Sequence, residues 1–439
     1  MNLAERRSRL ERLLLDHAPL WQASTFREAR PAWCADHPAL CTALLALDDV
    51  TLDALTADSA LALGWLLPML PALKPLATLT DLPFVVRDLN ASVVGSDSFP
   101  ALETIDSSTS VNASDSFVSA AASDRAAARG SPPEGRRFDE AGARANRDIP
   151  GRKVGQIDAF VAAVGKPQGP LVEWCAGKGH LGRRFLTRWG GEALAVERNA
   201  TLCDQGETLA RRVRDPQRFL VADVMAAASA ETLRGAHAVA LHACGDLHRR
   251  LVEAAAQVAA PAIDLAPCCY QLTARETYQP LFAPSPLRLD RNALKLAVTE
   301  TVTATPRDAM VSAQGSAWKL AFVALREALQ GLGYQPFRPV PASWQGDGFA
   351  HYLQRLAARE AVCLPAGLDL DVCEAWGWQR HRESRRLQLV RLAFRRAIEV
   401  WLLCDLGAWL EKQGYSVELR EFCARSLTPR NLLLSARLI

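Results

Sequence analysis

The stretch Leu171-Val-Glu-Trp-Cys-Ala-Gly-Lys-Gly-His-Leu-Gly182 joins a short apolar run to a glycine-rich turn, and it decides the fold. Residues 170–174 predict a buried strand. Gly177, Gly179 and Gly182 then allow a tight turn into a helix. The free N–H groups at the start of such a helix face a bound ligand. The stretch therefore predicts a strand–loop–helix unit that binds a ligand.

Four more short apolar runs follow, separated by helical patterns, at 192–197, 218–223, 238–243 and 260–266. This alternation is typical of a parallel, doubly wound α/β sheet. The chain ends differently, with two strands predicted at 416–422 and 431–438 and only a short turn between them. Strands joined so closely must be antiparallel. A Rossmann-like, seven-stranded sheet that closes on an antiparallel hairpin is expected of class I methyltransferases rather than of dinucleotide-binding dehydrogenases.

Composition predicts three regions. Residues 1–86 are predicted to form a helical accessory domain, since leucines recur there at helical spacing and nothing resembles a site. Residues 87–136 are rich in Ser, Ala and Asp, and they contain too few large apolar side chains to fold by themselves, so we expect a linker. Residues 137–439 are predicted to form the α/β domain, with helical insertions at about 271–315 and 344–411.

The 439 residues carry a net charge of +3, so any nucleic-acid surface must be local. Eleven cysteines without a CxxC pair argue against a disulfide framework or a zinc ribbon, and for a reducing compartment. The longest apolar run, 60–73, is too short to cross a membrane, and the start of the chain lacks the pattern of a secretory signal. We expect a cytoplasmic protein with no membrane partner. The sequence does not determine its oligomeric state.

The glycine loop has two interpretations. Gly177, Gly179 and Gly182 spell GxGxxG, and Glu197 follows Gly177 by twenty residues, which is also the spacing of a nicotinamide dinucleotide site. A carboxylate at Glu173, at the end of the first strand, instead suits the amino group and sulfonium of S-adenosylmethionine. Glu197 ends the second predicted strand, where it is placed for the ribose hydroxyls, and Asp223 ends the third, near the adenine. As a set, these carboxylates favour S-adenosylmethionine as the cofactor.

Polar side chains follow the fourth and fifth predicted strands, whose carboxyl ends face the same crevice. The predicted catalytic residues are His242, Cys244, Asp246, Cys268, Cys269 and Tyr270. Three interpretations stay open for the cysteines: small buried hydrophobic side chains, thiolates for covalent catalysis, or metal ligands. The metal interpretation ranks last because the ligand spacing is irregular, and no metal is predicted.

The chain from about residue 136 onward resembles the class I methyltransferase family that includes the eukaryotic methyltransferase-like twenty-five proteins. The glutathione S-transferase C-terminal-domain-containing protein and the tRNA position-four 2′-O-methyltransferase carry related domains. The matching motifs occur in order: Gly151-Arg-Lys-Val-Gly-Gln156, Gly177-Lys-Gly-His-Leu181, His242-Ala-Cys-Gly-Asp246, Pro267-Cys-Cys-Tyr270, Arg291-Asn-Ala293, Gly348-Phe-Ala-His-Tyr352, the 389–399 helix and Leu427-Thr-Pro-Arg-Asn431. Cys175 departs from the usual pattern, because most methyltransferases have a glycine at that point of the loop.

This resemblance implies S-adenosylmethionine-dependent methyl transfer. The residues expected to bind the cofactor are Lys153, Gln156, Glu173, Cys175, Ala176, Gly177, Gly179, His180, Glu197, Arg198, Asp223, Val224 and His242. The acceptor does not follow from the resemblance, because the family is diverse.

We expect the acceptor to be RNA, either tRNA or rRNA. Seven arginines lie between residues 380 and 396 and could neutralise phosphates, although they could equally form a solvated helix face. The alternatives are methylation of a protein or small molecule, and a binding module without catalysis. The acceptor atom and the role of the first 86 residues are not determined by the sequence.

Overall fold

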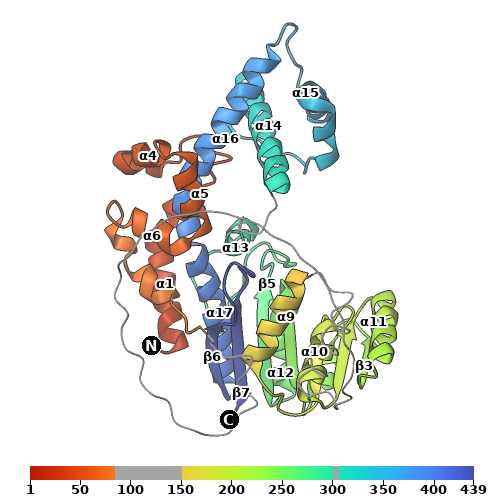
Figure 1. Cartoon of the computed structure of the whole chain (residues 1–439). Helices are drawn as coiled ribbons and strands as arrows, with labels where there is room; N and C mark the ends of the chain where they lie inside the picture. Colours follow the sequence, from red (N-terminus) through yellow and green to blue (C-terminus); the bar gives the residue numbers. More distant parts are fainter. Residues whose placement is uncertain (85–150, 300–305) are drawn as a thin grey trace, which may run out of the picture.

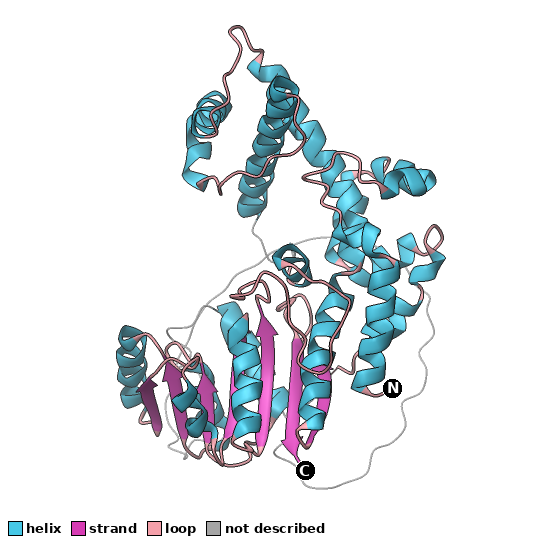
Figure 2. Cartoon of the chain, turned by 180° about the vertical axis from the view of Figure 1, so that it is seen from behind, coloured by secondary structure: helices cyan, strands magenta, loops and turns pink. Residues whose placement is uncertain are grey.

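The computed structural model describes residues 1–84, 151–299 and 306–439. The predicted linker at 87–136 lies outside these ranges. A seven-stranded sheet in the order β3-β2-β1-β4-β5-β7-β6 forms the centre of the α/β region, as Figure 2 shows. Its strands are β1 (Leu171–Trp174), β2 (Ala193–Glu197), β3 (Gln217–Val221), β4 (His237–Cys244), β5 (Ala262–Cys268), β6 (Tyr415–Glu421) and β7 (Leu432–Leu438).

Strands β1 to β5 are parallel, and β7 runs antiparallel to both of its neighbours. The predicted fold class and the terminal hairpin are therefore confirmed. Because β6 runs in the same direction as β5, the turn between β6 and β7 lies at the carboxyl edge of the parallel strands. This turn brings residues 422–431 to the same edge as the glycine loop.

Helices cover both faces of the sheet (Figures 1 and 2). Helices α9 and α10 pack together on one face, while α12 packs against α17 on the other. These and the neighbouring elements are α9 (Gly151–Val164), α10 (His180–Trp189), α11 (Ala200–Val213), η2 (Ala227–Leu233), α12 (Asp246–Gln257), α13 (Arg291–Ala297) and α17 (Arg395–Lys412). Helix α17 is buried along nearly its whole length, because it separates the sheet from the N-terminal helices.

A helical arm stands above the carboxyl edge of the sheet in Figure 1. It consists of α14 (Pro306–Gln330), η3 (Ala342–Asp347), α15 (Gly348–Arg359) and the first part of α16 (Leu370–Ala393). The arm has a core of its own, with Trp318, Phe322, Phe349 and Tyr352 among its buried side chains. The predicted insertion boundary at about 315 falls inside α14.

The N-terminal helices pack on α16 and α17 and share one hydrophobic cluster with the sheet. They are α1 (Leu3–Asp16), α2 (Ala18–Gln22), α3 (Trp33–Asp36), α4 (Pro38–Leu45), α5 (Asp49–Ala57), α6 (Ser59–Leu66), η1 (Pro71–Leu73) and α7 (Pro75–Thr80). Buried Leu10, Leu14 and Trp21 belong to the same cluster as Trp401 and Leu402 of α17. This continuous core anchors the helices to the rest of the protein.

One buried carboxylate joins the N-terminal helix α1, helix α17 and the segment 278–281. Asp405 of α17 is fully buried and accepts hydrogen bonds from Arg7 Nε at 2.9 Å, from the Tyr278 hydroxyl at 2.9 Å and from the Leu281 N–H at 2.7 Å. The Arg7 guanidinium also lies over the Trp401 ring, 4.9 Å from its centroid. The further hydrogen bonds to Asp405 offset part of the cost of removing both charges from water.

Strand β4 leaves one residue out of its pairing with β5. Leu241 pairs with Ala266 and Ala243 with Pro267, so His242 has no partner and Cys244 comes opposite Cys268. Such a bulge redirects the side chain of the unpaired residue. The feature lies at the carboxyl edge, where the predicted catalytic residues meet.

Within the parts of the chain that the structure describes, no helix is both long and apolar enough to cross a membrane.

Asp405→Ala is expected to lower the free energy of unfolding by about 3–5 kcal/mol, because it removes the fully buried partner of Arg7 and leaves that charge paired with Glu11 alone. Urea denaturation followed by circular dichroism measures the change. Asp53→Ala is the matched control, since Asp53 pairs with Arg385 at the surface and such pairs contribute about 1 kcal/mol or less. Equal losses in both variants would contradict the role assigned to Asp405.

Candidate cofactor and acceptor site

The loop after β1 turns sharply at residues with positive φ, at Cys175 (57°), Gly177 (57°) and Gly179 (69°). A side chain at Gly179 or Gly182 would come within 2.6 Å or less of the Gln217 amide, so these two glycines are required by packing against β3. A Cβ at Gly177 would meet nothing within 4 Å. Among the three glycines of the motif, Gly177 is therefore the one that faces space for a ligand.

One carboxylate binds this loop from the end of β2, and a second lies two residues beyond the end of β3. Glu197 accepts hydrogen bonds from the Gly177 N–H at 3.0 Å and from the Asn199 N–H at 2.9 Å. Asp223 is exposed and accepts from the Met225 N–H at 2.9 Å, while the neighbouring Val224 is buried. The structure thus brings the predicted ribose and adenine residues to one edge, with Glu197 already attached to the glycine loop.

Cys175 lies among these negative charges. Burial raises the pKa of its thiol to about 12, and the charges of Glu197, Cys244, Glu173 and Asp223 add to the effect. Cys175 is therefore a neutral thiol at pH 7. The N–H of the next residue, Ala176, donates to the Val196 carbonyl at 3.2 Å, which fixes the loop to β2.

Glu173 lies beneath the loop rather than at its surface. It is 5% exposed, and its carboxylate accepts from the Gly182 N–H at 2.8 Å. Burial raises its pKa to about 7, and the Gly182 N–H, Arg183 and Lys153 only partly oppose this effect. A positively charged ligand placed above the loop would favour its ionised form.

Helix α9 brings Gln156 to His242. The Gln156 amide N–H donates to the Leu427 carbonyl at 3.1 Å, and its oxygen lies 3.0 Å from His242 Nε2. This orientation makes Nε2 the donor and leaves Nδ1 as an unprotonated nitrogen, which is buried and has no hydrogen-bond partner. Burial, with Arg430 and Lys153, lowers the pKa of His242 to about 4, so the ring is neutral at pH 7.

The remaining predicted cofactor residues are placed less centrally. Lys153 is exposed on α9 but close enough to affect both Glu173 and His242. His180 opens α10, and its Nδ1 lies 2.7 Å from the Arg183 guanidinium. Arg198 is exposed just after β2.

Three cysteines meet at the ends of β4 and β5. The sulfurs of Cys244 and Cys268 are 3.3 Å apart, and those of Cys244, Cys268 and Cys269 all lie within 4.8 Å of one another. Hydrogen bonding from Cys268 lowers the pKa of Cys244 to about 6, with help from Cys269 and Arg430 and against the effect of burial. The hydrogen bond to Cys244 and burial raise the pKa of Cys268, so one thiolate is stabilised within the group.

Asp246 and Tyr270 lie on the other side of these strand ends. Asp246 accepts from the Ala274 N–H at 2.8 Å at the start of α12. Tyr270 is buried, its hydroxyl has no hydrogen-bond partner, and its ring meets that of His248 at 5.3 Å between centroids. Asp246 therefore has a structural contact that the sequence did not predict, and Tyr270 packs within the protein.

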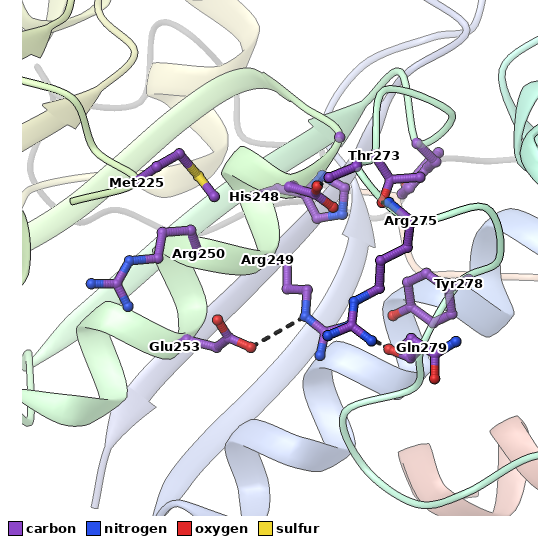
Figure 3. A pocket seen from close by; sticks show the side chains of 13 residues that line it. Met225, His248, Arg249, Arg250, Glu253, Thr273, Arg275, Tyr278 and Gln279 are labelled. Carbon is purple, nitrogen blue, oxygen red and sulfur yellow. Dashed lines mark hydrogen bonds and ion pairs between the residues drawn. The ribbon is translucent and has the colours of Figure 1, made fainter. Parts of the chain in front are cut away.

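Asp246 and Tyr270 open onto a cavity of about 250 Å³, drawn in Figure 3. Arg249, Arg250 and Arg275 line it, and we call them the pocket arginines. Arg249 pairs with Glu253 at 3.2 Å and also donates to the Gln279 carbonyl. The Nε of Arg250 is buried without a partner.

The arginines of residues 380–396 have a different role from the predicted one. Most hold the N-terminal helices: Arg380 donates to the Thr25 carbonyl, Arg385 pairs with Asp53, Arg386 with Asp49, Arg391 donates to the Trp21 carbonyl, and Arg395 donates to the Ser59 hydroxyl. Arg396 pairs with Glu399 and Glu421, and Arg382 is exposed. Six of these seven guanidinium groups are therefore engaged within the chain, which leaves Arg382 as the exposed one.

Sequence reasoning missed Arg430 and the pocket arginines. Arg430 lies in the β6–β7 turn, and its charge affects His242, Cys244 and Cys269. The predicted hairpin contained the signal, since a turn that follows a strand parallel to β5 must lie at the carboxyl edge. The pocket arginines had no comparable signal.

Comparison with known proteins agrees with this geometry. Residues 152–276 match the model of a family described as a methyltransferase domain. No curated protein matches the sequence. The solved structures that match include the cyclopropane synthase MmaA2 from Mycobacterium tuberculosis, at 13% identity and a TM-score of 0.23, covering 70% of this chain and 97% of that one.

The open position at Gly177 and the carboxylates at the ends of β2 and β3 fit a cofactor that carries a ribose and a positive charge. Together with the family match, they identify the chain as an enzyme with an S-adenosylmethionine-dependent methyltransferase domain.

Gly177→Arg is expected to abolish S-adenosylmethionine binding, because the new side chain fills the open space beside Glu197. Isothermal titration calorimetry measures the affinity. Gly191→Arg is the control, since Gly191 also has a positive φ and open surroundings but lies at the opposite edge of the sheet, before β2. Unchanged binding in Gly177→Arg would place the cofactor elsewhere.

Glu173→Gln is expected to remove a pH dependence of stability. Below pH 4.5 the carboxyl group is protonated in both states, and above it the unfolded chain ionises first, so stability is lost as pH rises to about 7. The total is about 3 kcal/mol for a pKa raised from 4.5 to about 7. The free energy of unfolding is measured by urea denaturation without cofactor from pH 4 to 8. The value for the variant should rise relative to that of the wild type as the pH increases. Parallel profiles would show that the buried carboxyl group does not titrate in this range.

Proposed function

We propose that this methyltransferase domain acts on RNA, either tRNA or rRNA. The observation that carries the proposal is the cavity at the carboxyl ends of β4 and β5, which the pocket arginines line. Guanidinium groups bind phosphate oxygens through paired hydrogen bonds. Tyr270 and Tyr278 line the same cavity, and their rings pack against His248 and Trp401 within the protein.

The charge of the cavity supports an anionic acceptor. Arg275 is exposed and points from the 271–279 segment into the cavity (Figure 3). The lining has three arginines against two carboxylates, Asp246 and Glu253, so it keeps a net positive charge to offer to phosphates. The resemblance to a group of proteins that includes a tRNA 2′-O-methyltransferase is a second support for RNA.

The chain's own residues supply the remaining parts of the reaction. When bound, S-adenosylmethionine supplies a methyl group on a positively charged sulfur. We assign Glu197 and Asp223 to hold the ribose and adenine, and Gly177 to permit close approach to the backbone. In-line displacement depends mainly on the positions of donor and acceptor.

A hydroxyl acceptor would also need a base. The neutral ring of His242, with its free Nδ1 held in place through Gln156, is the group we assign to accept that proton. If the acceptor is a ring nitrogen with a free lone pair, this step is not required.

The test is transfer of labelled methyl groups from S-adenosylmethionine to bulk tRNA and rRNA, together with RNA binding at several salt concentrations. Arg275→Ala is expected to weaken RNA binding by about tenfold and to reduce the salt dependence by about one phosphate contact. Its affinity for S-adenosylmethionine should be unchanged. Arg382→Ala is the matched control, since Arg382 is also exposed but lies on α16, away from the cavity.

Methyl incorporation into neither RNA pool, with cofactor binding intact, would overturn the RNA proposal and favour a protein or small-molecule acceptor. Equal effects of the two substitutions would show that RNA does not use this cavity.

A further inference from the structure

Three thiols are grouped together at the ends of β4 and β5. Cysteines that only fill a hydrophobic core do not require such a grouping. Cys268 is buried, while Cys244 and Cys269 are half-buried, so the group is partly exposed. Each sulfur comes from a different backbone position: the end of β4, the end of β5 and the first residue after β5. Among the described residues, this is the group of cysteine, histidine and acidic side chains whose geometry suits a metal ion.

The backbone near this group contains non-glycine residues with positive φ, which are strained. Of the six non-glycine residues with positive φ in the described ranges, three lie at this edge: Cys175, His242 and Cys269. A non-glycine residue in this region costs on the order of 1 kcal/mol or more, and such residues concentrate at functional sites. At Cys269 the turn follows β5 directly, and at His242 the bulge brings Cys244 opposite Cys268. Glycines would make the same turns without strain, but a glycine at 269 would remove one of the three sulfurs.

The spacing of the sulfurs fits a tetrahedral thiolate site. Zinc binds cysteine sulfur at about 2.3 Å, so two tetrahedral thiolate ligands lie about 3.8 Å apart. The Cys244–Cys268 distance of 3.3 Å and the 4.8 Å limit on all pairs bracket that value. Small rotations about the Cα–Cβ bonds would bring the three sulfurs to equal spacing.

The charge around the group also balances. Three thiolates and one divalent cation carry a net charge of −1. The Arg430 guanidinium acts on both Cys244 and Cys269, and its Nε is buried without a hydrogen-bond partner. A negatively charged metal–thiolate group would give this buried nitrogen a partner.

From this geometry we propose that Cys244, Cys268 and Cys269 bind one zinc ion, with the fourth ligand position open to water or to an acceptor atom. Three protein ligands and one open position are the arrangement of catalytic rather than structural zinc sites. The site lies beside the cofactor loop, because the charge of Cys244 raises the pKa of Cys175 in that loop. The proposal rests on neither the cofactor nor the RNA assignment, since metal binding is measured without either.

The test is titration of the full-length, reduced and metal-stripped protein with Co²⁺, followed by competition with Zn²⁺. We expect one Co²⁺ per chain, with the thiolate charge-transfer absorption and the visible bands of a tetrahedral ion, and displacement by one Zn²⁺. Cys244→Ser, Cys268→Ser and Cys269→Ser should each weaken Zn²⁺ binding by about 100-fold or more. Cys373→Ser is the matched control, since Cys373 is half-buried on α16 and outside the group.

A second measurement uses only the wild-type protein, in case a variant does not fold. Bound Zn²⁺ should protect Cys244, Cys268 and Cys269 from alkylation, as located by mass spectrometry, and leave Cys373 and Cys363 unprotected. Absence of a one-to-one thiolate–Co²⁺ spectrum, or equal alkylation with and without Zn²⁺, would overturn the proposal and leave the cysteines as packing or nucleophilic groups.

Discussion

The pairing of β4 with β5, with His242 left out, is the constraint on which the site depends. Parallel strands place paired residues side by side. The unpaired His242 therefore determines which side chains of β4 and β5 meet at the carboxyl edge. With the bulge, Cys244 lies opposite Cys268 and His242 turns to Gln156. Without it, Cys244 would lie opposite the residue after Cys268, and the ring of His242 would take a paired position within the sheet.

The other end of the same strand pair is held by a buried carboxylate. Asp264 of β5 is fully buried and is bound to His237 of β4 at 2.6 Å and to Arg437 of β7 at 2.8 Å. It also accepts from the Ser435 hydroxyl. These bonds fix the register of β4 on one side of β5 and of the antiparallel hairpin on the other. Because the hairpin is fixed, its turn carries Arg430 to the thiols and Leu427 to Gln156.

The arginines of α16 and α17 show how a sequence pattern and a structural role can differ. A run of like charges on a helix is typical of a phosphate-binding surface. In this fold the same helix is covered by the N-terminal region, whose carbonyls and carboxylates take up the guanidinium groups, as at Asp49 and Trp21. Arginines of α12 and of the 271–279 segment instead line the cavity at the ends of β4 and β5.

The sequence by itself determined the strand–helix alternation, the terminal hairpin and the glycine loop, because hydrophobic periodicity and glycine requirements act locally. It also placed Glu197 at the end of β2, while β3 ends at Val221, two residues before Asp223. Only the tertiary structure decided that Gly177 faces open space while Gly179 and Gly182 serve packing, because that depends on Gln217 from a distant strand. The same holds for the thiol group. One unpaired residue in β4 aligns Cys244 with Cys268, and no local pattern in the sequence marks a bulge that is fixed by long-range strand pairing.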